Sequence, residues 1–191
     1  MNSMNSLPTL PDAFFHGSAM AFRHIDVTKG RGRKDFGRGF YMSFSASQAV
    51  GMMHKKFRES VSRRKDQSYG VLRETLYRIE IDVDVLKALR VKVFPSADLE
   101  WLNFVLLCRP SNGVPHDFDV VIGPTADDDT NMALKYYYDG TYGHPETEDA
   151  KRMLLRVLDV NKLGVQLFIG SQSVADRLVK KMEIVDWREY A

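Results

Sequence analysis

The chain has 191 residues, of which 44% are hydrophobic and 27% are charged, and its net charge at pH 7 is +2. This composition predicts one folded domain and excludes an intrinsically disordered protein. The single cysteine, Cys108, excludes an intramolecular disulfide and a cysteine-based zinc cluster, and we expect it to lie in the core. The first twelve residues lack the pattern of a secretory signal, and no run approaches the roughly 18 apolar residues of a membrane span. We therefore expect a cytoplasmic protein that does not contact a membrane.

The hydrophobic pattern predicts a loose N-terminal tail over residues 1–11 and a single domain over residues 12–191. Several short strands are unevenly interleaved with helices, which favours an α+β fold over a doubly wound parallel sheet. No GxGxxG fingerprint follows any predicted strand, so a Rossmann site is not expected. In chain order the predicted elements are strand 13–16, strand 40–44, helix 45–63, strand 71–83, a helix that begins after Asp98, strand 119–122, helix 130–139, helix 148–158, strand 165–169, helix 171–180 and strand 182–187.

The first segment that suggests chemistry is FFHGS, residues 14–18. A strand holds the imidazole of His16, and the missing Cβ of Gly17 would let a ligand approach the backbone. Taken alone, a histidine at the end of a strand is more often structural than catalytic.

The second segment is KDFGRGFYMSFSASQA, residues 34–49. Glycines before an aromatic strand permit close approach of a ligand, and Tyr41 offers a flat ring for stacking. Serine hydroxyls at Ser45 and Ser47 lie where a helix is expected to begin. The alternative is a glycine turn that leads into an edge strand with a core aromatic residue.

A basic, glycine-interleaved loop spans residues 29–38 and contains five lysines and arginines and one acid. A flexible basic loop suits a phosphate-bearing ligand, and Arg38 lies at its end. A solvated surface is the alternative interpretation of such a charge run.

Together the two segments resemble the diphtheria-toxin and poly(ADP-ribose) polymerase branch of the ADP-ribosyltransferases. The resemblance implies a split β-sheet core with flanking helices and a pocket for NAD. It implies that His16 binds a ribose hydroxyl, that the backbone of Gly17 holds the nicotinamide amide, and that Tyr41 stacks on the nicotinamide ring. Ser45 or Ser47 would contact the carboxamide. The NAD-binding set that we expect is completed by Ser18, Arg38 and Gly39.

Five motifs in order along the chain identify it more closely as a member of the bacterial DUF3990 family, whose fuller description is a domain of unknown function. They are His16-Gly17-Ser18, the KDFGRGFY segment at 34–41, Glu100-Trp101-Leu102 with Phe104, the segment 119–128, and Gln166 with Phe168. The resemblance implies a toxin that pairs with an antitoxin protein.

Gln166 is the main departure from the transferase pattern, which has a glutamate at this third position. An amide keeps the hydrogen bond but supplies no negative charge to the oxocarbenium ion that forms as nicotinamide leaves. Asp35, Asp127 and Asp128 are the candidates for a substitute acid. Asp128 or the next aspartate could instead cap the helix that begins near residue 130. The aspartate run lacks the spacing of a calcium loop, so no metal is expected.

Three functions follow from these observations. The first is an enzyme that cleaves NAD and transfers ADP-ribose to a macromolecule, protein or nucleic acid, with His16, Tyr41, Gln166 and Asp127 or Asp128 at its catalytic site. The second is a catalytically silent module that binds NAD or ADP-ribose and acts through a partner. The third is a toxin that acts on nucleic acid through its basic loops. For the first two we expect His16, Tyr41 and Gln166 to converge on one cleft.

Overall fold

A computed structural model describes residues 7–30, 32–63, 71–126, 130–158 and 164–191, with side chains described except at residues 63, 130 and 131. These residues form one α+β domain around a sheet of seven strands in the order β4-β5-β6-β2-β1-β3-β7. The strands are β1 (Phe14–Ser18), β2 (Phe40–Ser43), β3 (Thr75–Ile81), β4 (Val91–Val93), β5 (Val120–Pro124), β6 (Val165–Ile169) and β7 (Val179–Val185). The helices are α1 (Ala46–Arg63), α2 (Val83–Lys87), α3 (Leu99–Cys108), α4 (Thr130–Tyr138), α5 (Glu148–Val157) and α6 (Gln172–Leu178).

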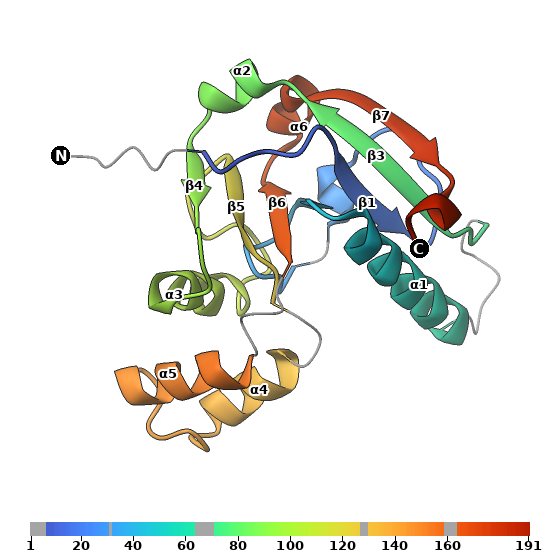
Figure 1. Ribbon diagram of the computed structural model, residues 1–191. Helices are drawn as coiled ribbons and strands as arrows, with labels where there is room; N and C mark the ends of the chain where they lie inside the picture. The colour runs from blue at the N-terminus through green and yellow to red at the C-terminus, as the bar shows by residue number, and fades with distance from the viewer. Residues whose placement is uncertain (1–6, 31, 64–70, 127–129, 159–163) are drawn as a thin grey trace.

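The sheet is divided between β1 and β2. These two strands pair at one position, Phe15 opposite Ser43, whereas β1 pairs with β3 along its whole length and β2 pairs likewise with β6. One half therefore contains β4, β5, β6 and β2, and the other contains β1, β3 and β7. The two halves lie on opposite sides of the molecule in Figure 1, with α1 beneath the half that contains β1.

Helices cover both faces of this divided sheet. Leu86 of α2 and Leu178 of α6 join the apolar cluster on one face, which spans both halves. On the opposite face, α3, α4 and α5 pack over β5 and β6, with Trp101 as the largest fully buried side chain. Met53 of α1 packs separately over β1 and β3. The opposite face thus carries two helical layers, one on each side of the line where β1 and β2 diverge.

The predicted α+β class is confirmed, and most predicted elements occur within a few residues of their expected bounds. Strand 165–169 has the predicted bounds, and Asp98 caps α3 by accepting a hydrogen bond from the Trp101 amide at 3.0 Å. Among the α-helices and strands, α2 and β4 were not predicted, nor were the short 3-10 helices Val27–Lys29 and Trp187–Tyr190. Cys108 is buried, as expected. No helix in the described part of the chain is long and apolar enough to cross a membrane.

Candidate functional site

His16 lies at the line where the two halves of the sheet diverge. Its ring stacks on Phe40 of β2, with 4.5 Å between ring centroids, and Phe22 meets it edge-on at 5.9 Å. Phe22 is held in place by Tyr77, whose hydroxyl donates to the Phe22 carbonyl at 2.8 Å and accepts from the Phe22 amide at 2.5 Å. Aromatic side chains from both halves of the sheet thus fix the imidazole.

The hydrogen bonds of His16 define its tautomer. Nδ1 lies 2.7 Å from the backbone carbonyl oxygen of Tyr41. A carbonyl only accepts, so Nδ1 carries the proton and Nε2 presents a lone pair. Burial lowers the pKa of His16 to about 3, the Lys56 ammonium lowers it as well, and the bond to Tyr41 opposes both. At neutral pH, His16 is therefore uncharged, and its Nε2 is a hydrogen-bond acceptor.

Continuing the β1–β2 ladder by two residues would bring Gly17 opposite Tyr41, but their backbones do not pair. The Tyr41 carbonyl accepts from His16 instead, and the Gly17 carbonyl accepts from the ammonium of Lys56 at 2.9 Å. Two side chains therefore replace one rung of the ladder. We call this place, bounded by His16, Gly17, Tyr41 and Lys56, the open rung.

The expectation that His16 and Tyr41 line one pocket is wrong. Side chains alternate between faces along a strand, and the pairing of Phe15 with Ser43 places His16 with Phe40, and Tyr41 with Gly17. The Tyr41 ring lies on the opposite face of the sheet, 5.1 Å from the ring of Phe168. Only the backbone of Tyr41 reaches His16.

The hydroxyl of Tyr41 holds the loop that precedes β2. It donates to the Gly37 carbonyl at 2.6 Å and accepts from the Phe36 amide at 3.1 Å. Burial raises the pKa of Tyr41 well above its ordinary value, and the negative charge of Asp35 adds to the rise. The phenol is therefore a neutral structural group at physiological pH.

Gln166 also lies on the face opposite His16, so the predicted convergence of the three residues does not occur. Its amide donates to Asp35 Oδ2 at 2.9 Å. The same oxygen accepts from the Ala126 amide at 2.9 Å, and Asp35 Oδ1 accepts from Arg109 at 2.7 Å and 2.9 Å. Asp35 and Gln166 are both buried. These contacts join the loop before β2 to β6 and to the end of α3, so this candidate acid is bound to an arginine and lies away from His16.

At two glycines where we expected a ligand to approach, other atoms of the protein occupy the space that a side chain would fill. A Cβ on Gly17 would lie 2.0 Å from the Ala49 carbonyl oxygen in α1. A Cβ on Gly39 would lie 2.2 Å from the ring of Phe168 and 2.4 Å from the Ile169 carbonyl oxygen. The space beside each glycine is thus occupied by packing, and a ligand could meet Gly17 only at its backbone edge.

The predicted serines lie near the ends of their elements. The Ser45 hydroxyl accepts from the Gln48 amide at 3.3 Å, which caps α1, and lies 2.9 Å from the Ser47 hydroxyl. Ser18 accepts from the Met20 amide at 3.2 Å. Each of these hydrogen bonds joins residues that are near in sequence, so the hydroxyls have structural roles at the ends of their elements.

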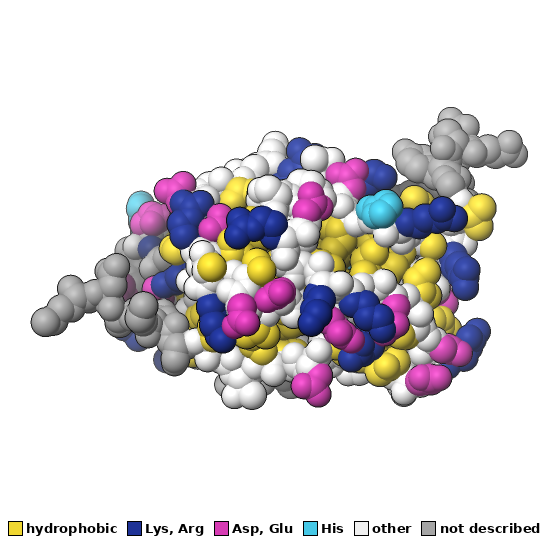
Figure 2. All heavy atoms as spheres, turned by 90° about the horizontal axis from the view of Figure 1, so that it is seen from above, with side chains coloured by type: hydrophobic (Ala, Val, Ile, Leu, Met, Phe, Trp, Pro, Cys, Tyr) yellow, Lys and Arg dark blue, Asp and Glu magenta, His cyan; other side chains and the backbone are white. Residues whose placement is uncertain are grey.

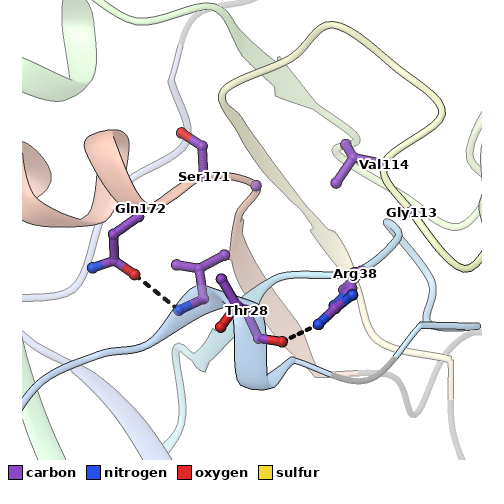
Figure 3. Close-up of a pocket in the computed structure, with 8 residues that line it drawn as sticks. Thr28, Arg38, Gly113, Val114, Ser171 and Gln172 are labelled. Atoms are coloured by element: carbon purple, nitrogen blue, oxygen red, sulfur yellow. Dashed lines mark hydrogen bonds between the residues drawn. The ribbon is translucent and has the colours of Figure 1, made fainter.

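Arg38 lines a shallow cavity of about 310 Å³ between the loop before β2 and the start of α6 (Figure 3). Its guanidinium donates to the Gly30 carbonyl at 3.0 Å and to the Thr28 carbonyl. Gln172, across the cavity, accepts from the Val27 amide at 3.0 Å. A second cavity of about 190 Å³ shares Val114, Gly170 and Ser171 with the first. Arg38 therefore holds its own loop through backbone carbonyls.

Asp127 and Asp128 lie outside the described residues, so the structure does not place them. The described residues contain no group of three or more histidine, cysteine or acidic side chains that could hold a metal ion. Two further histidines have hydrogen-bond partners. His54 is 2.7 Å from Glu74, and His116 is 3.0 Å from the Phe36 carbonyl. On the face in Figure 2, basic and acidic side chains are intermixed.

The comparison with protein families found one match. The model of the family described as "Protein of unknown function (DUF3990)" matches residues 13–179, which include β1 to β6 and α1 to α6. No curated protein and no solved structure matches the chain. The match spans most of the chain and includes the open rung, so the protein belongs to the DUF3990 family.

Proposed function

We propose that the chain binds NAD at the open rung and transfers its ADP-ribose to a macromolecular acceptor. The observation that carries the proposal is the backbone edge of Gly17, which does not pair with β2 and whose carbonyl is bound by Lys56, beside the uncharged imidazole of His16. A strand edge offers an N–H and a C=O side by side, and a primary amide such as that of nicotinamide complements both.

His16 supplies the second contact. Its Nε2 lone pair suits a donor, and the ribose next to nicotinamide carries hydroxyl donors. Because the bond between Nδ1 and the Tyr41 carbonyl fixes the ring, Nε2 is oriented before a ligand arrives. A neutral imidazole also adds no positive charge beside the cationic sugar that forms during cleavage.

The reaction would break the bond between the ribose carbon and the pyridinium nitrogen. The bonding electrons stay with the nitrogen, so nicotinamide leaves as a neutral molecule and the ribose becomes an oxocarbenium ion. A nucleophile of the acceptor then forms a bond to that carbon and loses a proton. In this scheme His16 positions the ribose and Gly17 positions the leaving group, while Tyr41 and Gln166 stabilise the fold from the other face.

A second candidate is a module that binds NAD or ADP-ribose without cleaving it. The buried contacts among Gln166, Asp35 and Arg109 favour it, because they keep the third position of the transferase pattern away from His16. Measured cleavage separates the two candidates, since only the enzyme releases nicotinamide.

The proposal is tested by incubating the protein with labelled NAD and a cell lysate, and by following free nicotinamide and labelled macromolecules. His16→Asn is the informative variant, because an asparagine amide can still donate to the Tyr41 carbonyl but lacks the Nε2 acceptor. His24→Asn, at an exposed position, is the matched control. We expect a loss of roughly tenfold or more in NAD binding by calorimetry for His16→Asn alone. Equal NAD binding by both variants and the wild type would contradict the proposal.

The family resemblance extends the proposal to a toxin that is neutralised by an antitoxin. Expression of the wild-type chain should then arrest growth of a bacterial host, and His16→Asn should relieve the arrest. Normal growth with the wild-type chain, at protein levels confirmed by blotting, would count against the toxin role.

A further inference from the structure

The packing of α1 against β1 places Lys56 at the open rung. Met53 of this helix is fully buried where α1 meets β1, and its Cβ approaches Gly17 closely. Lys56 follows three residues later on the same side of the helix, which directs its side chain toward the same strand. Its half-buried stem ends in an ammonium 2.9 Å from the Gly17 carbonyl oxygen. The tight packing at Gly17 therefore fixes the position of the lysine.

The Lys56 ammonium occupies the acceptor that a bound amide would need. It donates to the Gly17 carbonyl, and the amide of nicotinamide could donate to the same oxygen. The ring of NAD is also a pyridinium cation, so an ammonium at this position repels it. Free nicotinamide has an uncharged ring and would meet only the competition for the carbonyl.

We propose that Lys56 gates the open rung, and that NAD binds only when the ammonium leaves the Gly17 carbonyl. The inference rests on the proposed function, since it concerns the same site. Lys56 lowers the affinity of the site for NAD, and lowers its affinity for free nicotinamide to a smaller extent. The Lys56 ammonium therefore lowers the affinity for NAD, whose pyridinium ring is cationic, more than the affinity for neutral nicotinamide.

Lys56→Met is the test, because methionine keeps the apolar stem up to the ε position but removes the charge and the donors. Lys55→Met, the same change one residue earlier on α1, is the control. Lys56→Arg keeps both charge and donors and shows whether the position tolerates substitution. We expect Lys56→Met to bind NAD roughly tenfold more tightly than the wild type by calorimetry, with a smaller gain for free nicotinamide. Lys55→Met should bind like the wild type, and Lys56→Arg, which keeps the charge and the donors, should show none of the gain of Lys56→Met.

A second measurement does not require NAD. The Lys56 ammonium helps to lower the pKa of His16 to about 3, so Lys56→Met should raise that pKa, and Lys55→Met should raise it less. Nuclear magnetic resonance of the His16 ring during acid titration reports the change in each folded variant. An unchanged His16 pKa in Lys56→Met would show that the ammonium is not at the open rung and would overturn the inference.

The outcomes separate the two proposals. If the wild type binds NAD and Lys56→Met binds it equally or more weakly, the gate is overturned and the NAD site stands. If the wild type does not bind NAD but Lys56→Met does, the gate is supported in its strongest form. If neither protein binds NAD or nicotinamide, the proposed function fails, and the gate fails with it.

Discussion

Replacing Gln166 with glutamate tests the buried contacts opposite His16. The wild-type amide donates to Asp35 Oδ2 across 2.9 Å. Gln166→Glu removes that donor and places a second carboxyl beside the first. Two ionised carboxylates about 3 Å apart repel each other by about 5 kcal/mol at an effective dielectric constant of about 20. The less costly arrangement is for the pair to retain one proton, which also restores a hydrogen bond between the two groups.

The cost of retaining that proton depends on pH. An unfolded glutamate has a pKa of about 4.3, so holding the proton at pH 7 costs about 4 kcal/mol, at about 1.4 kcal/mol per pH unit. Arg109, bound to the other oxygen of Asp35, reduces this penalty. We therefore expect Gln166→Glu to lose about 2–4 kcal/mol of stability at pH 7. The folded pKa is raised, so the loss appears above about pH 4.3 and grows as the pH rises.

The assay is urea unfolding of the wild type and the variant at several pH values between about 4.5 and 7.5. Gln166→Met is the control, because it removes the same hydrogen bond without adding charge and should cost about 1–3 kcal/mol at every pH. The protonated pair supplies no new negative charge, so nicotinamide release should not rise in Gln166→Glu. A loss for Gln166→Glu that is independent of pH would refute the reasoning, as would wild-type stability at pH 7.5.

Three further predictions concern His16 and Tyr41. The nitrogen spectrum of His16 should show the neutral Nδ1–H tautomer down to about pH 4, because its pKa is about 3; a protonated ring at pH 5 would contradict this. Below about pH 6.5 the unfolded histidine binds a proton that the folded one does not, so the free energy of unfolding should fall as the pH drops toward 3. His16→Asn should make the free energy of unfolding depend less on pH in this range. Tyr41→Phe should lower the free energy of unfolding in urea by about 1–2 kcal/mol, because the Tyr41 hydroxyl makes two hydrogen bonds to the loop before β2. It should leave the His16 spectrum unchanged, since the two side chains lie on opposite faces of the sheet; a shifted spectrum would show that they are coupled.

The elements of the fold could be predicted from the sequence where a long pattern or a cap marked them. Strand 165–169 is a short apolar run that follows a glycine, and α3 begins at a capping aspartate. The five-residue α2 and the three-residue β4 were missed because neither is long enough to show a full period of hydrophobic residues. Local patterns therefore determined which elements exist, except for the shortest.

The arrangement of the candidate site could not be predicted in the same way. His16 and Tyr41 were identified as residues, but their faces depend on the pairing of Phe15 with Ser43. A shift of one residue in that register would exchange the faces of one strand, and nothing local in either segment specifies the register. Gly17 and Gly39 were likewise identified, but only the tertiary structure shows that helix and strand atoms fill the space beside them.

The open rung itself argues for a function beyond stability. Strand carbonyls that face a neighbouring strand need hydrogen-bond partners, and the simplest partners for Gly17 and Tyr41 would be each other's amides in a continued ladder. The protein instead satisfies their carbonyls with an imidazole and an ammonium. Immobilising a lysine side chain costs about 1.5–2 kcal/mol of rotamer entropy, and burial of the imidazole disfavours its charged form. Selection for stability alone would favour the ladder. A backbone edge whose carbonyls bond to an imidazole and an ammonium, and not to the neighbouring strand, suits the amide-bearing ligand that we propose.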